Sequence, residues 1–109
     1  MGQTLKPEGV FNEEKPHIQP AKTGKNFKMV YFHLKAGQKI PLHTTSSEVV
    51  VTVLKGKGNF FAGSYENSNS LSKGESFFYE PDEPHGFEAV EDMIVQAVIT
   101  PIPEKKLQL

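Results

Sequence analysis

The chain has 109 residues, enough for one domain that buries a hydrophobic core without disulfides or a structural metal. It contains no cysteine, which excludes disulfides, thiolate catalysis and cysteine-ligated zinc or iron–sulfur sites. All 12 basic residues are lysines and the formal net charge is −1, so there is neither a basic patch nor an arginine fork for phosphate, and we expect no nucleic-acid partner.

The N-terminal stretch is polar and interrupted by prolines. Pro7, Pro16 and Pro20 restrict the residues before them to extended conformations, so residues 1–27 predict an extended arm rather than a helix. The stretch has no apolar segment like that of a signal peptide, and no run in the chain reaches membrane length. We therefore expect a cytoplasmic protein with no membrane partner.

Short apolar runs bounded by glycine, proline and asparagine follow the arm, and each predicts a β-strand. Residues 48–54 include four valines and a threonine, and their apolar character on both faces predicts a central strand packed on two sides. Residues 63–72 are rich in serine and asparagine and predict a polar loop, and 80–84 predict a rigid acidic loop. Strands are expected at 28–34, 39–43, 48–54, 59–62, 76–79, 87–90 and 93–100.

About eight to ten short strands with no sustained helical period indicate an all-β domain, either a sandwich or a barrel. A double-sheet jelly roll suits this number of strands. An immunoglobulin-like sandwich is the alternative, but the chain has neither the cysteines nor the tryptophan of that fold's core. We predict one domain over residues 1–109, with an arm at 1–27, a barrel core at 28–100 and a tail at 101–109.

Two stretches that each begin with a glycine carry a family resemblance: GQKIPLHTTSSEVVVTVLKG at residues 37–56 and GESFFYEPDEPHGF at residues 74–87. Their spacing resembles the two motifs of the small single-domain cupins, RmlC-like proteins with the cupin 2 type of conserved barrel. In that family two histidines and a glutamate of the first motif, with a histidine of the second, hold a divalent metal. His43 and His85 stand at two of these positions, whereas Thr45 and Val49 occupy the other two. The resemblance therefore implies a double-stranded β-helix, or jelly-roll cupin barrel, with a degenerate metal motif.

The first functional hypothesis is a small-molecule site inside this barrel. Because side chains alternate along a strand, each adjacent pair of aromatic residues sends one ring inward, where it can line an apolar lumen. We expect a ligand to contact His43, Thr45, Val49, His85 and Phe87. No residue is assigned a catalytic role, since the sequence shows neither a serine-type nucleophile arrangement nor a phosphate-binding loop.

The alternative hypothesis is a metal-dependent enzyme of the dioxygenase or isomerase type. Its metal would be held by His43, His85 and Glu48, or by a carboxylate of the 80–83 loop in place of Glu48. Two imidazoles and one carboxylate suit Fe(II), Mn(II), Ni(II) or Zn(II) and leave positions open for a substrate. The resemblance also implies a homodimer. His33 shares a strand face with Tyr31, and we expect it in the core or at the surface rather than in the site.

Overall fold

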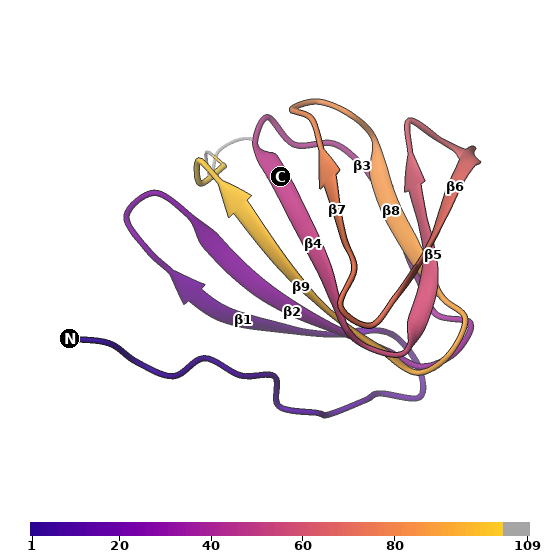
Figure 1. Cartoon of the computed structure of the whole chain (residues 1–109), viewed down its shortest axis with the longest axis horizontal. Coiled ribbons are helices and arrows are strands. Elements are labelled where there is room, and N and C mark those ends of the chain that lie inside the picture. The colour runs from indigo at the N-terminus through magenta and orange to yellow at the C-terminus, as the bar shows by residue number, and fades with distance from the viewer. Residues whose placement is uncertain (104–109) are drawn as a thin grey trace.

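The structure, a computed structural model, describes residues 1–103, so that the part of the predicted tail at 104–109 lies outside the described residues. The described chain consists of antiparallel strands and connecting segments. The strands are β1 (His17–Thr23), β2 (Lys28–Leu34), β3 (Lys39–His43), β4 (Glu48–Lys55), β5 (Lys57–Ala62), β6 (Ser64–Ser72), β7 (Ser76–Tyr79), β8 (His85–Ala89) and β9 (Met93–Thr100) (Figure 1). Within residues 1–103, no helix is long and apolar enough to cross a membrane.

The strands form two sheets, one on each side of the molecule in Figure 1. The five-stranded sheet has the order β1-β2-β9-β4-β7, and the four-stranded sheet has the order β3-β8-β5-β6. Although β9 follows the other strands in sequence, it lies in the middle of the larger sheet, between β2 and β4. The predicted all-β class and two-sheet jelly-roll architecture are confirmed.

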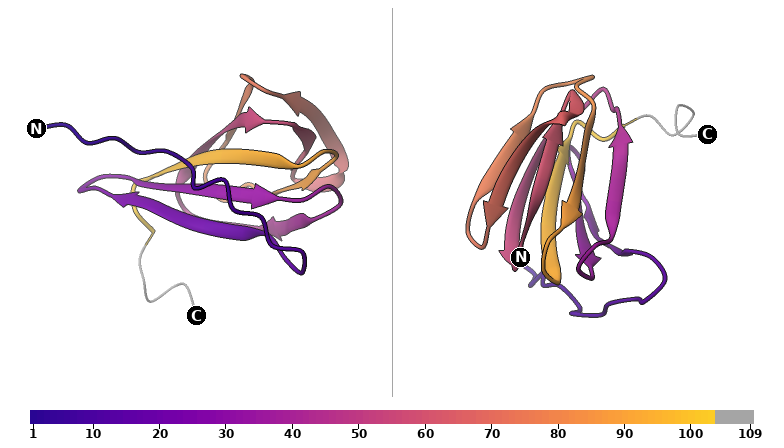
Figure 2. Two further views of the ribbon diagram at one scale, coloured as in Figure 1. Left: turned by 90° about the horizontal axis from the view of Figure 1, so that it is seen from below. Right: turned by 90° about the vertical axis from the view of Figure 1, so that its right-hand side faces the viewer.

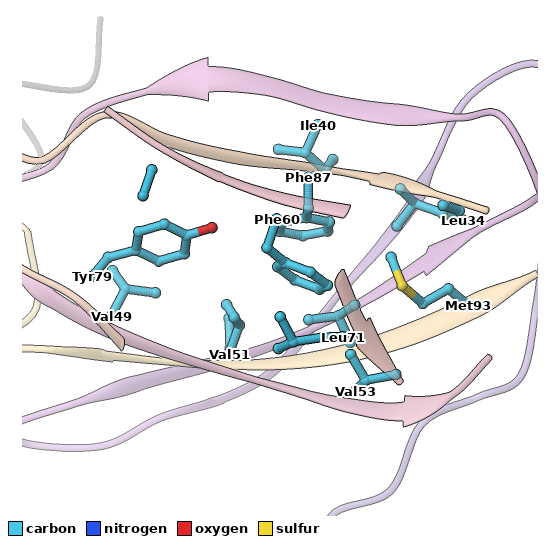
Figure 3. Close-up of a cluster of buried hydrophobic side chains, with 14 residues drawn as sticks. Leu34, Ile40, Val49, Val51, Val53, Phe60, Leu71, Tyr79, Phe87 and Met93 are labelled. Carbon is cyan, nitrogen blue, oxygen red and sulfur yellow. The ribbon is translucent and has the colours of Figure 1, made fainter. Parts of the chain in front are cut away.

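The core lies between the sheets and is built by strand alternation (Figure 3). On β4, Val49 and Val53 face the core and are 3% and 0% exposed, whereas Val50 faces outward and is 39% exposed. Phe60 of β5 stacks on Phe87 of β8, with ring centroids 4.9 Å apart. The central position predicted for β4 is confirmed, because it lies between β9 and β7. The prediction that both of its faces are packed is wrong, since the outer face is only partly covered.

Two strands lie where the sequence predicted none. Strand β1 falls within the predicted arm and pairs with β2, with a bulge between Pro20 and Lys22. Proline is tolerated there because β1 is an edge strand, whose outer N–H groups need no partner. Strand β6 replaces the loop predicted at 63–72 and pairs with β5 at the edge of the smaller sheet. Most of its side chains are exposed, so it needs no apolar residues to form.

The first 16 residues cross the outer face of the five-stranded sheet (Figure 2). The N–H of Gly9 donates to Nε2 of His33 over 3.1 Å, and the ring of Phe11 packs edge-on against the same imidazole with centroids 5.7 Å apart. His33 lies on the outward face of β2 and is 0% exposed. It is therefore buried by the arm, far from the core between the sheets.

Candidate functional site

A cavity of about 530 Å³ opens between the two sheets. This volume lies within the roughly 300–1,000 Å³ that small-molecule sites occupy. Inward-facing side chains of both sheets form its apolar wall, which consists of Phe32, Val49, Val51, Phe87, Ala97 and Ile99. Polar groups also line the cavity, namely Lys28, His43, Thr44, Thr45, Ser46, Asp82 and His85. The cavity therefore has an apolar wall and a set of hydrogen-bonding groups.

Pairing of β3 with β8 brings the two histidines of the sequence motifs together. His43 ends β3, His85 begins β8, and the two are partners in the antiparallel register. Gly86 makes this approach feasible, because a Cβ atom at that position would lie 2.5 Å from the backbone oxygen of Ile40. The imidazole centroids of His43 and His85 are consequently 4.1 Å apart.

Backbone hydrogen bonds fix which nitrogen of each imidazole carries the proton. Nδ1 of His43 lies 2.9 Å from the carbonyl oxygen of Pro41, and Nδ1 of His85 lies 3.0 Å from that of Glu83. A carbonyl oxygen can only accept a hydrogen bond, so each Nδ1 must be the donor. The neutral form of each ring therefore carries a lone pair on Nε2.

Neither Nε2 atom has a hydrogen-bond partner among the described residues. His85 is 6% exposed, yet no fully buried side-chain nitrogen or oxygen in residues 1–103 lacks a partner. Its Nε2 must therefore be accessible, and since the residue lines the cavity, we infer that Nε2 opens into it. His43 lines the same cavity. The two rings thus offer a pair of neighbouring acceptors.

Burial is the main influence on the charge of His85. It lowers the pKa of His85 from the ordinary histidine value, because the charged ring loses water contact; the hydrogen bond to the Glu83 carbonyl raises it by less, and nearby His43 lowers it further. Tyr79 packs beneath His85 with ring centroids 5.0 Å apart, and burial raises the pKa of its phenol. Both side chains therefore favour their neutral forms.

The structure gathers all five side chains that the sequence assigned to the ligand. His43, Thr45, Val49, His85 and Phe87 line the one cavity. The sequence-based assignment did not include Phe32, which also lines the cavity, or Tyr79, which packs against His85. The inward parity of Phe32 on β2 could have identified it, whereas the position of Tyr79 under His85 follows from packing of β7 against β8 that no local pattern reveals.

The predicted third metal ligand lies apart from the histidines. Glu48 is exposed and is the residue before inward-facing Val49, so strand alternation directs it to the opposite face. Asp82 lines the cavity, and its N–H donates to the carbonyl oxygen of Thr45 over 2.8 Å. Nevertheless, no three His, Cys, Asp or Glu side chains within residues 1–103 are grouped closely enough to hold a metal ion. The donors present do not fit a metal centre.

Comparison with known proteins agrees with this fold. A family profile for the cupin domain matches residues 30–100. An RmlC-like cupin from Desulfovibrio desulfuricans is 32% identical, with 93% of this chain and 97% of that chain covered and a TM-score of 0.83. An uncharacterized conserved protein with a double-stranded β-helix domain from Klebsiella pneumoniae is 21% identical, with coverages of 89% and 83% and a TM-score of 0.76; the second likeness shows the fold alone. No curated protein matches the chain.

Proposed function

The chain belongs to the cupin family, and from that premise we propose that it binds a small organic molecule in the cavity between its sheets. One observation carries the proposal: two imidazoles whose Nε2 atoms have no partner within the described part of the chain line the same cavity of about 530 Å³ as an apolar wall. Sites for small molecules combine such apolar surface with a few polar groups that fix the orientation of the ligand.

The two parts of the lining have different roles in binding. Phe32, Phe87 and Ile99 offer apolar surface, and a ligand that displaces water from them gains roughly 25 cal/mol for each Å² of apolar area buried. His43 and His85 offer hydrogen bonds of defined direction, because their Nδ1 atoms are already held by carbonyl oxygens. The ligand we propose is therefore amphiphilic, with an apolar body and a polar end.

The donor set gives less support to the metal-dependent enzyme. The hydrogen bond from each Nδ1 to a carbonyl oxygen is also found around histidines that ligate metals. However, three-ligand sites of the catalytic zinc type and two-histidine-one-carboxylate sites need a third protein donor. Glu48 lies on the other face of β4, and Asp82 does not complete a group of three among residues 1–103.

Binding of a small-molecule panel to paired variants tests the proposal. The panel contains phenols, diols, amides, amines and carboxylic acids, and thermal shift and amide NMR spectra report binding. Ile99→Trp places a larger side chain on the cavity wall, whereas Val98→Trp places the same side chain on the outer face of β9. We expect compounds that shift the resonances of Thr45 and Phe87 in the wild type, and these shifts should weaken in Ile99→Trp and persist in Val98→Trp.

Two results would overturn the proposal. One is a panel in which no compound perturbs the cavity residues, or in which both tryptophan variants respond alike. The other is metal binding at one ion per chain after loading with Fe(II), Mn(II), Ni(II) or Zn(II), lost in both His43→Ala and His85→Ala. The second result would favour the metal-dependent enzyme and would require a ligand beyond the described donors.

A further inference from the structure

The geometry of the histidine pair points to a ligand class. We propose that the bound molecule carries two neighbouring hydrogen-bond donors, such as vicinal hydroxyl groups on an apolar ring, and presents them to Nε2 of His43 and Nε2 of His85. This inference rests on the proposed function, because it assumes that the cavity is a binding site.

The first step is the direction of the hydrogen bonds. Each Nδ1–H is committed to a backbone carbonyl two residues earlier in the chain, Pro41 for His43 and Glu83 for His85. The proton on each neutral ring is thereby fixed on the side away from Nε2. At these two Nε2 atoms the protein accepts hydrogen bonds and does not donate them, so the ligand must supply the donors that meet them.

The second step is the closeness of the two acceptors. The ring centroids are 4.1 Å apart and the rings are inclined at 56°, so one molecule can reach both nitrogens with adjacent groups. A carboxylate or an ether in the same place would set its own acceptor atoms against two lone pairs. A site built to pair with hydroxyl groups disfavours analogues that lack them, because such an analogue displaces water from the two acceptors without supplying hydrogen bonds in its place.

The third step is the apolar part of the wall. Phe32 and Phe87 pack edge to face with centroids 5.3 Å apart, and both line the cavity together with Ile99. Such a surface favours a flat or compact apolar body over a fully hydroxylated one. The class that meets all three conditions is a small neutral molecule with an apolar body and a vicinal pair of O–H groups.

Matched probes that differ only in their donors test this class. 4-Methylcatechol has two adjacent donors, 4-methylphenol has one, 3,4-dimethoxytoluene has acceptors alone, and 4-methylbenzoate is an anion; cis-1,2-cyclohexanediol repeats the donor pair on an aliphatic ring. Titrations are run at about pH 7.5, one unit above the ordinary histidine pKa, with a chelator present so that catechol cannot act through a trace metal. We expect 4-methylcatechol to bind about tenfold more tightly than 4-methylphenol for the one hydrogen bond gained.

Two further measurements connect the preference to the imidazoles. The ¹⁵N resonances of both Nε2 atoms in the wild type should move when 4-methylcatechol is added and stay unchanged with 3,4-dimethoxytoluene. His85→Phe and His43→Phe should remove the preference for 4-methylcatechol over 4-methylphenol. His17→Phe, the same substitution at a histidine outside the cavity, should retain it. The resonance measurement needs no variant, so it decides the question even where a substitution impairs folding.

The outcomes separate this inference from the proposed function. Equal affinity for the four toluene-derived probes, tighter binding of 4-methylbenzoate, or unmoved Nε2 resonances would overturn the ligand class. If another panel compound still binds in a manner sensitive to Ile99→Trp, the small-molecule function stands and only the class is wrong. If no compound of either set perturbs the cavity, both fail.

Discussion

Acidification is expected to loosen the N-terminal arm by protonating His33. In the neutral ring, Nδ1 donates to the carbonyl oxygen of His17 over 3.4 Å and Nε2 accepts the N–H of Gly9 over 3.1 Å. Protonation adds a hydrogen to Nε2, which then opposes the N–H of Gly9, also a donor. The titratable groups facing His33 are the ring of His17, with its centroid 5.2 Å away, and Glu8, which lies 2.8 Å from His17.

The sign of the pH effect follows from the pKa of His33 in the folded protein. Burial lowers this pKa, the hydrogen bond to the His17 carbonyl raises it by less, and the nearby side chains of His17 and Glu8 have smaller effects, the first lowering it and the second raising it. The unfolded chain therefore binds a proton first. Stability contributed by the neutral ring is complete above about pH 6.5 and declines as the pH falls towards the lower pKa of the folded protein.

The size of the effect follows from the contact that is lost. Protonation leaves the Nε2–H of the fully buried His33 facing the N–H of Gly9 with no acceptor, and an unsatisfied buried donor costs about 1–3 kcal/mol, which multiplies the undocked fraction of the arm by about 5 to 150. The arm has other contacts, including a hydrogen bond from Gln38 to the carbonyl oxygen of Asn12 over 2.7 Å. We therefore expect release of the segment around Gly9 without unfolding of the barrel.

Urea unfolding between about pH 7.5 and 5.5 measures the stability, and the amide resonance of Gly9 reports docking of the arm. His33→Phe retains a ring under Phe11 but leaves the Gly9 N–H unpaired at every pH, so it should be less stable at neutral pH and show a shallower pH dependence. His17→Gln keeps His33 titratable, so the free energy of unfolding should change with pH as it does in the wild type. The reasoning would be refuted if the free energy of unfolding depended on pH equally in the wild type and His33→Phe, or if the amide resonance of Gly9 did not change with pH.

Four substitutions, one of them a matched control, test other parts of the fold by urea unfolding. Gly86→Ala should destabilise the protein by about 1–3 kcal/mol, because its methyl group would meet the backbone oxygen of Ile40; an unchanged midpoint would contradict the close approach of β3 and β8. Phe60→Ala should cost about 3–5 kcal/mol, whereas Phe78→Ala on the outer face, where the side chain is 46% exposed, should cost far less. Tyr79→Phe should reduce the loss of stability above about pH 10, since burial raises the phenol pKa and the unfolded chain ionises first.

Local pattern and motif spacing were sufficient to locate the parts of the candidate site that lie on residues 37–56 and 74–87. The motif spacing placed His43, Val49 and His85 at one site, and these three residues line one cavity; the alternative hypothesis also placed Glu48 there, although strand alternation directs it to the opposite face. Strand alternation is a local rule, so a sequence reveals it. The predicted homodimer and cytoplasmic location stay predictions.

Features that depend on distant partners could not be predicted in this way. Strand β6 has few apolar side chains because it lies at a sheet edge, and its identity as a strand comes from pairing with β5. In the sequence His33 is one residue of an alternating strand, and nothing near it indicates that it is buried. Its burial depends on Gly9 and Phe11, more than 20 residues earlier. Such contacts are set by tertiary structure and leave no periodic signal.

The position of β9 also constrains how the protein is made. Because β9 supplies the shared neighbour of β2 and β4, a nascent chain on the ribosome holds these two strands with unsatisfied inner edges until residues 93–100 emerge. Pairing across such sequence distances is slow to form. A chain that ends before β9 would thus form two disconnected fragments of the larger sheet rather than a shorter functional barrel. Such a chain would be prone to aggregation and to clearance by chaperones and proteases.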